Sequence, residues 1–385
     1  HRAMIESSHL GHRSITRPVD HAHDEESGQE LEPDRTRTKE RCIVAQLSGI
    51  KMVVGVVAIG VVLVTLVACS RLGGGSDGAA PGDTAPLSAE AAAGTVAPGV
   101  NPVGTTSDAS LTAGGVTRTY HLYVPSDLPA DTPVPLLVGL HGGTGWGTQF
   151  EANSGFDRLA EANGFIVVYP DGVGIGRNAD RLRTWNAGLC CGPAQKNGVD
   201  DVAFVSQVID AVSQAHAIDP ARVFVAGHSN GAMLGYRLAC ELSDKIAAVA
   251  VVAGTLAVQP CTPGQPVSFL EIHGTGDRNV PIDGGVGDRG ISQVDYPSVR
   301  TGIATMASLN GCTGDPTVTI AGDLTTTTWG SCDGSTTVRL VAIAGAAHAW
   351  PGSAPTRLNV SGPPYPGYDA SREIWAFLSA HPRSI

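Results

Sequence analysis

The residues from about 115 to 385 alternate short apolar runs with amphipathic segments, and this alternation limits the possible folds more than any other feature. It is typical of βαβ units, in which helices connect the buried strands of a parallel sheet. We therefore expect one α/β domain with a mainly parallel central sheet flanked by helices. An edge strand is predicted at 116–124, and buried strands at 135–140, 165–169, 223–226, 247–253, 267–272 and 337–343.

Helices are predicted between these strands, at 201–218, 230–242, 297–309 and 371–380. The first has the clearest helical period, because its apolar residues recur at three- and four-residue steps: Val202, Val205, Val208, Ile209 and Val212. Asp200 or Asp201 stands where its N-cap is expected. The stripe indicates a helix that packs against the sheet.

The first 119 residues contain no Phe, Tyr or Trp, although aromatic side chains contribute much of the buried area in most cores. Residues 1–51 show no helical or strand period, and we expect a disordered extension there. The chain opens with His1 rather than Met, as a misplaced translation start would give. Residues 69–114 are dominated by Gly, Ala, Pro, Ser and Thr, which predicts a flexible linker. The folded domain is therefore expected to span 115–385.

Residues 52–68 form an apolar run without a charge, between Lys51 and Cys69. The run is shorter than the roughly 20 residues of a membrane-spanning helix and longer than the apolar part of most secretory signals. Its end, Leu-Val-Ala-Cys at 66–69, resembles the lipobox of bacterial lipoproteins, whose Cys is diacylated. We expect a lipoprotein signal at 52–68 and lipidation of Cys69, with an uncleaved signal anchor as the alternative. Either would place the domain outside the cell, tethered to a membrane.

The net charge of the chain limits which partners it can bind. A net charge of −11 and a pI near 5.5 leave no basic surplus to displace counterions from a phosphate backbone, so we expect no nucleic-acid partner. The sequence contains no cofactor motif and no set of residues with metal-ligand spacing, so neither a cofactor nor a metal is expected. We expect a monomer.

The segment Gly-His-Ser-Asn-Gly at 227–231 has the form G-x-S-x-G. It follows a predicted strand and opens a predicted helix, which is the context of a nucleophile elbow. A second match at 74–78 lies in the linker, with no strand before it and no helix after it. We therefore predict that Ser229 is the nucleophile of a hydrolase. The alternative is a serine that only caps a helix.

A serine hydroxyl needs a base to take its proton and a third group to orient that base. Asp277 follows the predicted strand at 267–272, and His348 follows the strand at 337–343. Loops after parallel strands meet at one edge of a sheet, where Ser229 also lies. The order Ser, Asp, His is that of the α/β-hydrolases.

Other residues compete for these roles. Asp283 and Asp288 lie in a Gly-rich loop farther from the strand end, and they are the alternatives to Asp277. His273 ends the strand before Asp277, and we assign it to packing. The developing oxyanion requires N–H donors, which we assign to the backbone of Gly143, in the His-Gly-Gly turn, and of Asn230. Thr144 is the alternative to Gly143, and the alternative for the whole segment is a tight turn without function.

Several segments together resemble one family of α/β-hydrolases, the poly(3-hydroxybutyrate) depolymerases and feruloyl esterases, which includes actinobacterial lipoproteins. They are LHGGTGWG, YPDG, TWNAGLCCG, DDVAFVSQVID, IDPARVFVAGHSNGAM, LACE, IHGTGD and HAWPG, between about residues 116 and 380. The resemblance implies a serine esterase whose catalytic residues are Ser229, Asp277 and His348. Ala232 and Ala347 stand where this family often has Gly, and both keep a small side chain.

The six cysteines beyond the linker suit disulfides in an oxidising compartment. Cys312 and Cys332 flank a Thr-rich segment that can form a hairpin, and we pair them. We expect Cys190 and Cys191 to pair with Cys240 and Cys261 in an order that the sequence does not give. Buried free thiols are the alternative.

The substrate is expected to be an ester, and a polymeric one. Only 13 residues separate the strands that end at 253 and begin at 267, too few for a large lid domain, so an open groove is expected. Trp146, Trp185 and Trp350 lie in loops at the active edge, where they could contact substrate or anchor the loops. We expect a secreted esterase for polyhydroxyalkanoate chains or for feruloyl and acetyl esters of polysaccharides. The alternatives are a peptidase of the same fold and an inactive cell-surface binding protein.

Overall fold

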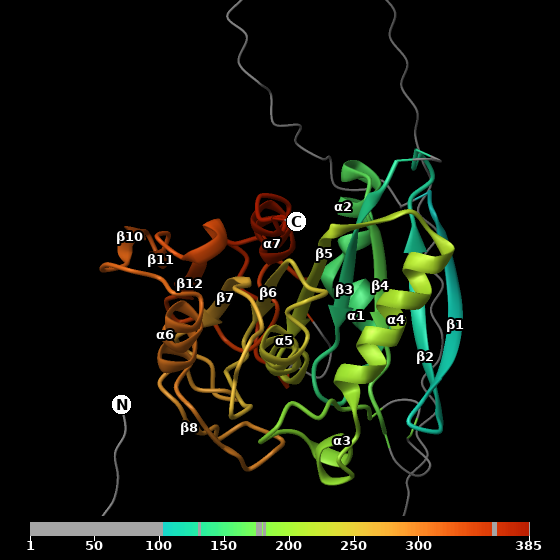
Figure 1. Ribbon diagram of the computed structural model, residues 1–385. Coiled ribbons are helices and arrows are strands. Elements are labelled where there is room, and N and C mark those ends of the chain that lie inside the picture. Colours follow the sequence, from blue (N-terminus) through green and yellow to red (C-terminus); the bar gives the residue numbers. More distant parts are fainter. Residues whose placement is uncertain (1–102, 130–131, 175–178, 180–181, 356–359, 385) are drawn as a thin grey trace, which may run out of the picture. The chain divides into compact units, whose positions relative to one another are not determined.

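The computed structural model describes residues 103–129, 132–174, 179, 182–355 and 360–384. The predicted extension, the signal segment, Cys69 and the linker up to residue 102 lie outside the described residues. Within them, ten strands form one sheet in the order β1-β2-β4-β3-β5-β6-β7-β12-β11-β10 (Figure 1). The strands are β1 (Thr105–Ala113), β2 (Val116–Val124), β3 (Val134–Leu140), β4 (Ile166–Pro170), β5 (Ile218–His228), β6 (Ala248–Val252), β7 (Ser268–Gly274), β10 (Thr317–Ala321), β11 (Leu324–Trp329) and β12 (Val338–Ile343).

The strands from β4 to β12 in this order run parallel, while β2, β1, β11 and β10 pair antiparallel at the two sides. The parallel strands are buried on both faces, and β3, β6 and β7 contain no exposed residue. Such strands require helices on both faces of the sheet. The expected mainly parallel α/β sheet is confirmed.

Helices cover both faces of the sheet (Figure 1). One apolar cluster packs α4 (Asp201–Ala215), α5 (Asn230–Glu241) and α6 (Val299–Leu309) against one face. The other packs α1 (Gly147–Ser154), α2 (Phe156–Asn163) and α7 (Ala370–Ser379) against the opposite face. Alternate strand residues enter the two clusters: Leu136 and Val138 belong to the first and Leu137 to the second.

The four predicted helices are present as α4, α5, α6 and α7. The side chain of Asp200 accepts the backbone N–H of Ala203 and caps α4, as predicted. No pattern in the sequence indicated α1, α2 and α3 (Gly192–Lys196), which have five to eight residues each. Such segments are too short to show a repeating apolar stripe.

The predicted start of the domain at residue 115 is wrong. Residues 105–113, assigned to the linker, form β1, which pairs along its whole length with β2 around a turn at Gly114 and Gly115. Both glycines have positive φ, as a two-residue hairpin turn requires. The small polar residues of β1 resemble a linker in composition, and they form a strand because they pair with β2. β2 is therefore not the edge strand that its pattern predicted.

A buried ion pair joins the antiparallel side of the sheet to α4. Arg118 of β2 is 2.8 Å from Asp201, with its Nη2 on the carboxylate Oδ1, and both side chains are almost fully buried. The other oxygen of Asp201 accepts the backbone N–H of Asn186 at 2.7 Å. The guanidinium also lies 3.9 Å from the centre of the Phe204 ring. This pair fixes the loop 182–200 relative to the sheet.

Two connections at the active edge differ in length. The segment 253–267, between β6 and β7, contains no helix and no strand. The longer segment 275–298, between β7 and α6, carries a small hairpin of β8 (Gly285–Val286) and β9 (Asp295–Tyr296). Over the described residues, no helix has both the length and the apolar character needed to cross a membrane.

Candidate active site

Ser229 lies at the sharp turn between β5 and α5. Its φ of 55° and ψ of −119° are unfavourable for a residue with a Cβ, and such strain is typical of a nucleophile elbow. The glycines at 227 and 231 make the turn possible. A Cβ on Gly227 would lie 2.5 Å from the carbonyl oxygen of Gly231, and one on Gly231 would lie 2.4 Å from that of Leu140. The two glycines of the motif are therefore sterically required.

The register of the sheet brings the other loops to this turn. Leu140 at the end of β3 pairs with Gly227, so the His-Gly-Gly turn lies beside the elbow. Gly274 at the end of β7 pairs with Ile343 at the end of β12, so the loops that carry Asp277 and His348 are neighbours. All of these loops follow the carboxyl ends of parallel strands and meet at one edge.

Ser229, His348 and Asp277 form a continuous hydrogen-bonded chain. His348 Nε2 is 2.8 Å from Ser229 Oγ, and His348 Nδ1 is 2.6 Å from Asp277 Oδ2. Asp277 and His348 are buried, whereas Ser229 is half-buried and lines the cleft. The structure thus brings together the three side chains singled out in the sequence. In this geometry His348 can take a proton from Ser229 while Asp277 fixes its tautomer.

Both carboxylate oxygens of Asp277 have hydrogen-bond partners. Its Oδ1 accepts the backbone N–H groups of Asn279 at 2.8 Å and Val280 at 2.9 Å. Burial opposes its ionisation, but the charge and the hydrogen bond of His348, together with the charge of His273 and the Val280 N–H, keep the pKa of Asp277 below its usual range. The alternatives, Asp283 and Asp288, instead form exposed ion pairs with Arg300 and Arg278.

The two backbone groups predicted as oxyanion donors lie next to each other. A Cβ on Gly143 would be 3.6 Å from the Cβ of Asn230. Among the described residues, neither backbone N–H has a hydrogen-bond acceptor, and Asn230 opens a helix, where such groups are expected. The N–H of Thr144, the alternative donor, is engaged with the carbonyl of Arg183 at 2.7 Å. The arrangement therefore favours Gly143 over Thr144.

Three side chains that the sequence did not single out hold this arrangement: the buried His141 and Asn230, and the partly buried His228. The ring of His141 donates through Nδ1 to the Gly142 carbonyl at 2.8 Å and accepts the Gly172 N–H through Nε2 at 2.9 Å. Burial lowers its pKa to about 4, which keeps the ring neutral. The Asn230 side chain forms two hydrogen bonds with the backbone of Trp185, joining the elbow to the loop 182–200.

The third such side chain is His228, next to the nucleophile. Its Nε2 is 2.8 Å from the backbone carbonyl of His348, which can only accept, so this nitrogen carries a proton. Burial lowers the pKa of His228 to about 4 and keeps it uncharged. His228 therefore ties the loop of His348 to the elbow. A histidine inside G-x-S-x-G was the only signal in the sequence.

The three tryptophans occupy different environments. Trp146 is half-buried in the wall of the cleft, where a substrate can reach it. Trp185 is fully buried, and its indole N–H donates to the His141 carbonyl, so of the two expected roles its place fits that of a loop anchor. Trp350 borders the cleft but is only 2% exposed and packs edge-on against Phe150 and Phe156. Both residues anchor loops because their rings meet other buried rings.

A cleft of about 830 Å³ lies over Ser229. Residues of the segment 275–298 form one wall, and the loops after β3 and β4 form another. Three exposed apolar side chains stand at its border: Leu189, Ile291 and Val360, which are 54%, 68% and 46% exposed. This border is apolar and accessible, which the sequence did not reveal because the three residues come from separate loops.

The disulfides correct one prediction. Cys312 pairs with Cys332, as predicted, and the hairpin of β10 and β11 lies between them. Cys240 at the end of α5 pairs with Cys261. Cys190 pairs with its neighbour Cys191, not with Cys240 or Cys261. Cys190 and Cys191 precede α3 and lie near Tyr296, away from the bond at the end of α5. Two adjacent cysteines gave no sequence signal for a bond with each other.

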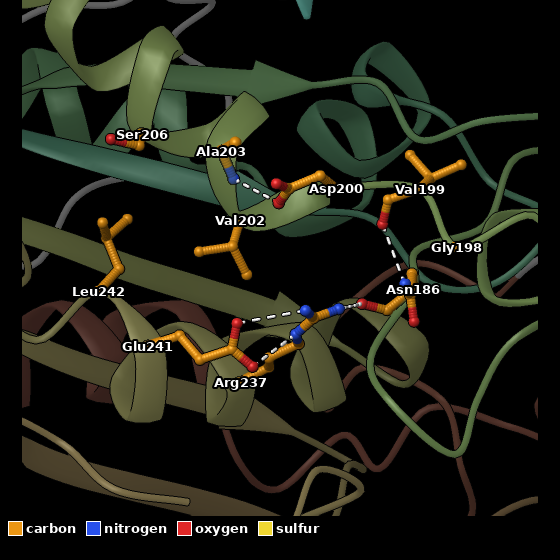
Figure 2. A pocket seen from close by; sticks show the side chains of 10 residues that line it. All are labelled: Asn186, Gly198, Val199, Asp200, Val202, Ala203, Ser206, Arg237, Glu241 and Leu242. Atoms are coloured by element: carbon orange, nitrogen blue, oxygen red, sulfur yellow. Dashed lines mark hydrogen bonds and ion pairs between the residues drawn. The ribbon is translucent and has the colours of Figure 1, made fainter. Parts of the chain in front are cut away.

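A second hollow, of about 480 Å³, lies between the start of α4 and the helix α5 (Figure 2). Its polar groups bind one another. Arg237 pairs with Glu241 at 2.8 Å and donates to the carbonyl of Asn186 at 2.8 Å, and the Asn186 side chain donates to the carbonyl of Val199. The hollow therefore belongs to the network that fixes the loop 182–200. Among the described residues, no group of three or more His, Cys, Asp or Glu could hold a metal ion.

The doubly covered parallel sheet and the turn at Ser229 define an α/β-hydrolase fold. The comparisons with known proteins lead to a narrower group. The family model "Esterase PHB depolymerase" matches residues 118–317, more than half of the chain. The chain therefore belongs to this esterase family, as its motifs indicated.

Two of the relatives that the chain matches are named as feruloyl esterases. Feruloyl esterase B from Piromyces equi is 31% identical over 232 residues, which are 58% of this chain and 41% of the relative. Feruloyl esterase C from Emericella nidulans is 30% identical over 211 residues, 51% of this chain and 71% of the relative. Among solved structures, acetyl xylan esterase from Aspergillus awamori is 18% identical, with a TM-score of 0.48, over 63% of this chain and 94% of that one. The chain thus spans less than half the length of feruloyl esterase B.

Proposed function

We propose that the chain is a serine esterase that hydrolyses carboxylic esters through an acyl-enzyme. The observation that carries this proposal is the hydrogen-bonded chain from Ser229 through His348 to Asp277. Membership of an esterase family supports it.

In the first half-reaction, Ser229 Oγ attacks the carbonyl carbon of the ester while His348 Nε2 takes the hydroxyl proton. The resulting oxyanion accepts hydrogen bonds from the N–H groups of Gly143 and Asn230. The intermediate collapses, the bond to the alcohol oxygen breaks, and His348 gives its proton to that oxygen. The alcohol leaves, and the acyl group remains on Ser229.

In the second half-reaction, water replaces the alcohol. His348 takes a proton from the water, whose oxygen attacks the acyl carbon and forms a second oxyanion in the same place. The proton then returns to Ser229 Oγ as the carboxylic acid leaves. Throughout, Asp277 stabilises the imidazolium form of His348.

The substrates that we propose are large esters, namely feruloyl or acetyl esters of polysaccharides or polyhydroxyalkanoate chains. The cleft of about 830 Å³ and the partly exposed Trp146 in its wall support a bulky substrate. Turnover of methyl ferulate, an acetylated xylan, polyhydroxybutyrate granules and a short nitrophenyl ester by the full chain would separate these classes. Activity on the nitrophenyl ester alone would contradict a large natural substrate.

The nucleophile is tested with a fluorophosphonate probe. We expect the wild-type chain to be labelled and Ser229→Ala to lose both labelling and ester turnover, because only the reactive hydroxyl is removed. Ser76→Ala, in the second G-x-S-x-G match, is the matched control and should keep both. An unlabelled wild-type chain would favour the alternative of an inactive binding protein.

We also propose that the protein is exported and held at a membrane by a lipid on Cys69. The apolar run 52–68 and its Leu-Val-Ala-Cys end support this proposal. Two acyl chains would anchor the protein stably, whereas one would bind reversibly. In cells, Cys69→Ser should lose incorporation of labelled fatty acid and partition into the aqueous phase. A variant that partitions with detergent like the wild type would indicate a spanning signal anchor.

A further inference from the structure

Two fully buried ionisable side chains lie behind the catalytic acid. Glu271 and His273 are two residues apart on β7, so they lie on the same face of that strand. Both have zero exposed surface. His273 Nδ1 is 2.9 Å from Glu271 Oε1. A buried ionisable pair is costly unless its partners are well placed, so its contacts need an explanation.

The His273 ring lies between Glu271 and Asp277. On its far side, Nε2 is 2.9 Å from the backbone carbonyl of Val280 and 3.4 Å from Asp277 Oδ2. This is the same Asp277 oxygen that contacts His348. Val280 also donates its own N–H to the other oxygen of Asp277. His273 therefore contacts both the acid and the loop that holds the acid.

The acceptors around His273 determine its protons. The Val280 carbonyl can only accept, so Nε2 carries a proton. On the other side, Glu271 Oε1 already accepts the backbone N–H of Gly254 at 3.1 Å, which favours the ionised carboxylate there. An ionised Glu271 requires a second proton on His273, at Nδ1. The arrangement thus corresponds to an imidazolium held between two carboxylates.

We propose that Glu271 and His273 are positioning residues for the catalytic acid, forming a buried ion pair whose positive end orients Asp277 and its loop toward His348. The proposal rests on the proposed triad. Neither residue touches the substrate, because neither borders the cleft. Together with the triad, they form a line of contacts from Glu271 through His273, Asp277 and His348 to Ser229.

The electrostatic directions at His273 and Asp277 agree with this role, whereas burial raises the pKa of Glu271 and opposes its ionisation. Burial opposes a charge on His273, but the hydrogen bond and charge of Glu271, together with the charge of Asp277 and the Val280 carbonyl, raise the pKa of His273 above its usual range. The charge of His273 in turn helps to lower the pKa of Asp277. The other ionisable groups near the pair are His348, His228 at the end of β5 and Tyr236 on α5, whose pKa is raised by burial and by the charge of Glu271.

The test is Glu271→Gln in the full chain. The amide has the same size and keeps an acceptor for Gly254, but it has no negative charge to balance an imidazolium, so His273 becomes neutral. We expect kcat to fall about tenfold to a hundredfold with little change in KM, because the acid is misplaced and the substrate is not touched. His273→Gln should show a similar loss.

The pH profile separates positioning from simple structural support. The positive His273 ring is nearer to the triad than Glu271, and it disfavours a second positive charge on His348. Its loss should make that charge on His348 less unfavourable, so we expect the acidic limb of kcat/KM to move to higher pH. Ser268→Ala, on the same strand and also buried, is the control and should leave the limb in place.

A measurement on the wild-type chain keeps the test valid if a variant does not fold. Histidine ¹⁵N NMR at about pH 8, above the ordinary histidine pKa of about 6.5, should show an imidazole protonated on both nitrogens. His121, whose pKa is raised to about 9, would give a similar signal, so the signal must persist in His121→Gln. If the His121→Gln variant shows no doubly protonated imidazole at this pH, the proposed ion pair of Glu271 and His273 is wrong.

The failures of the two proposals are distinguishable. If Glu271→Gln keeps kcat within threefold and the acidic limb does not move, the positioning role is wrong even though Ser229→Ala is inactive. If Ser229→Ala retains turnover, the proposed function is wrong, and the NMR signal alone decides whether the ion pair exists.

Discussion

Replacing Asp277 with Asn would remove the negative charge of the proposed catalytic acid at almost constant size. The structure fixes the orientation of the new amide. The Oδ1 position accepts two backbone N–H groups, from Asn279 and Val280, so the amide carbonyl must stay there. The amide NH₂ then replaces Oδ2, which lies 2.6 Å from His348 Nδ1.

This orientation reverses the hydrogen bond to the general base. An NH₂ group donates, so His348 Nδ1 must become the acceptor and its proton must move to Nε2. A protonated Nε2 cannot take the proton of Ser229 Oγ, which lies 2.8 Å away. The same substitution in a Ser-His-Asp triad costs roughly 10⁴-fold in kcat, or about 5.5 kcal/mol in the barrier. We expect a loss of that order, with KM little altered.

The assay is the kcat and KM of the full chain for a short nitrophenyl ester, with circular dichroism to verify the fold. Asp283→Asn and Asp288→Asn are matched controls in the same segment, because these aspartates form exposed ion pairs. Both should keep nearly full activity. If Asp277→Asn stayed within tenfold of the wild type while either control collapsed, the assignment of the acid would be refuted.

Three further predictions concern stability. Gly231→Ala should lower the free energy of unfolding by about 1–3 kcal/mol and abolish activity, because its Cβ would lie 2.4 Å from the Leu140 carbonyl oxygen. Thermal melting and probe labelling test this prediction, and a variant that stays active and equally stable would contradict it. Arg118→Met should lower the free energy of unfolding, measured in urea, by about 3–5 kcal/mol, because Asp201 would be left as an unpaired buried charge. Arg300→Met, which breaks an exposed ion pair, should lower it by about 1 kcal/mol at most. The hydrogen bond to Glu151 is the main cause that raises the pKa of His121 to about 9. Protonated His121 therefore stabilises the fold fully below about pH 6.5, and this contribution is lost as the pH rises through about 9. The wild type should lose on the order of 1 kcal/mol relative to His121→Gln over that range, and parallel stability curves for the two proteins would argue against the ion pairs of His121.

Much of the fold could be predicted because buried strands and amphipathic helices leave local patterns. The apolar stripe of α4 and its cap at Asp200 are examples, since both depend on residues within one or two turns of helix. The strand β1 could not be predicted, because its Thr, Ser and Ala residues become a strand only by pairing with β2. Cys190 and Cys191 were likewise misassigned, because pairing depends on where the chain places the sulfurs.

The sequence by itself determined which side chains could react. Glycines at 227 and 231 around Ser229, and an Asp and a His each just after a strand, are local signals of a nucleophile elbow and its partners. The tertiary structure decided how these residues are held. His228 on the His348 carbonyl, the His141 ring under its glycine turn and the pair of Glu271 and His273 behind Asp277 are contacts mostly between separate strands and loops. Such contacts leave no periodic pattern in the chain, because they arise only when the register of the sheet brings the strand ends together.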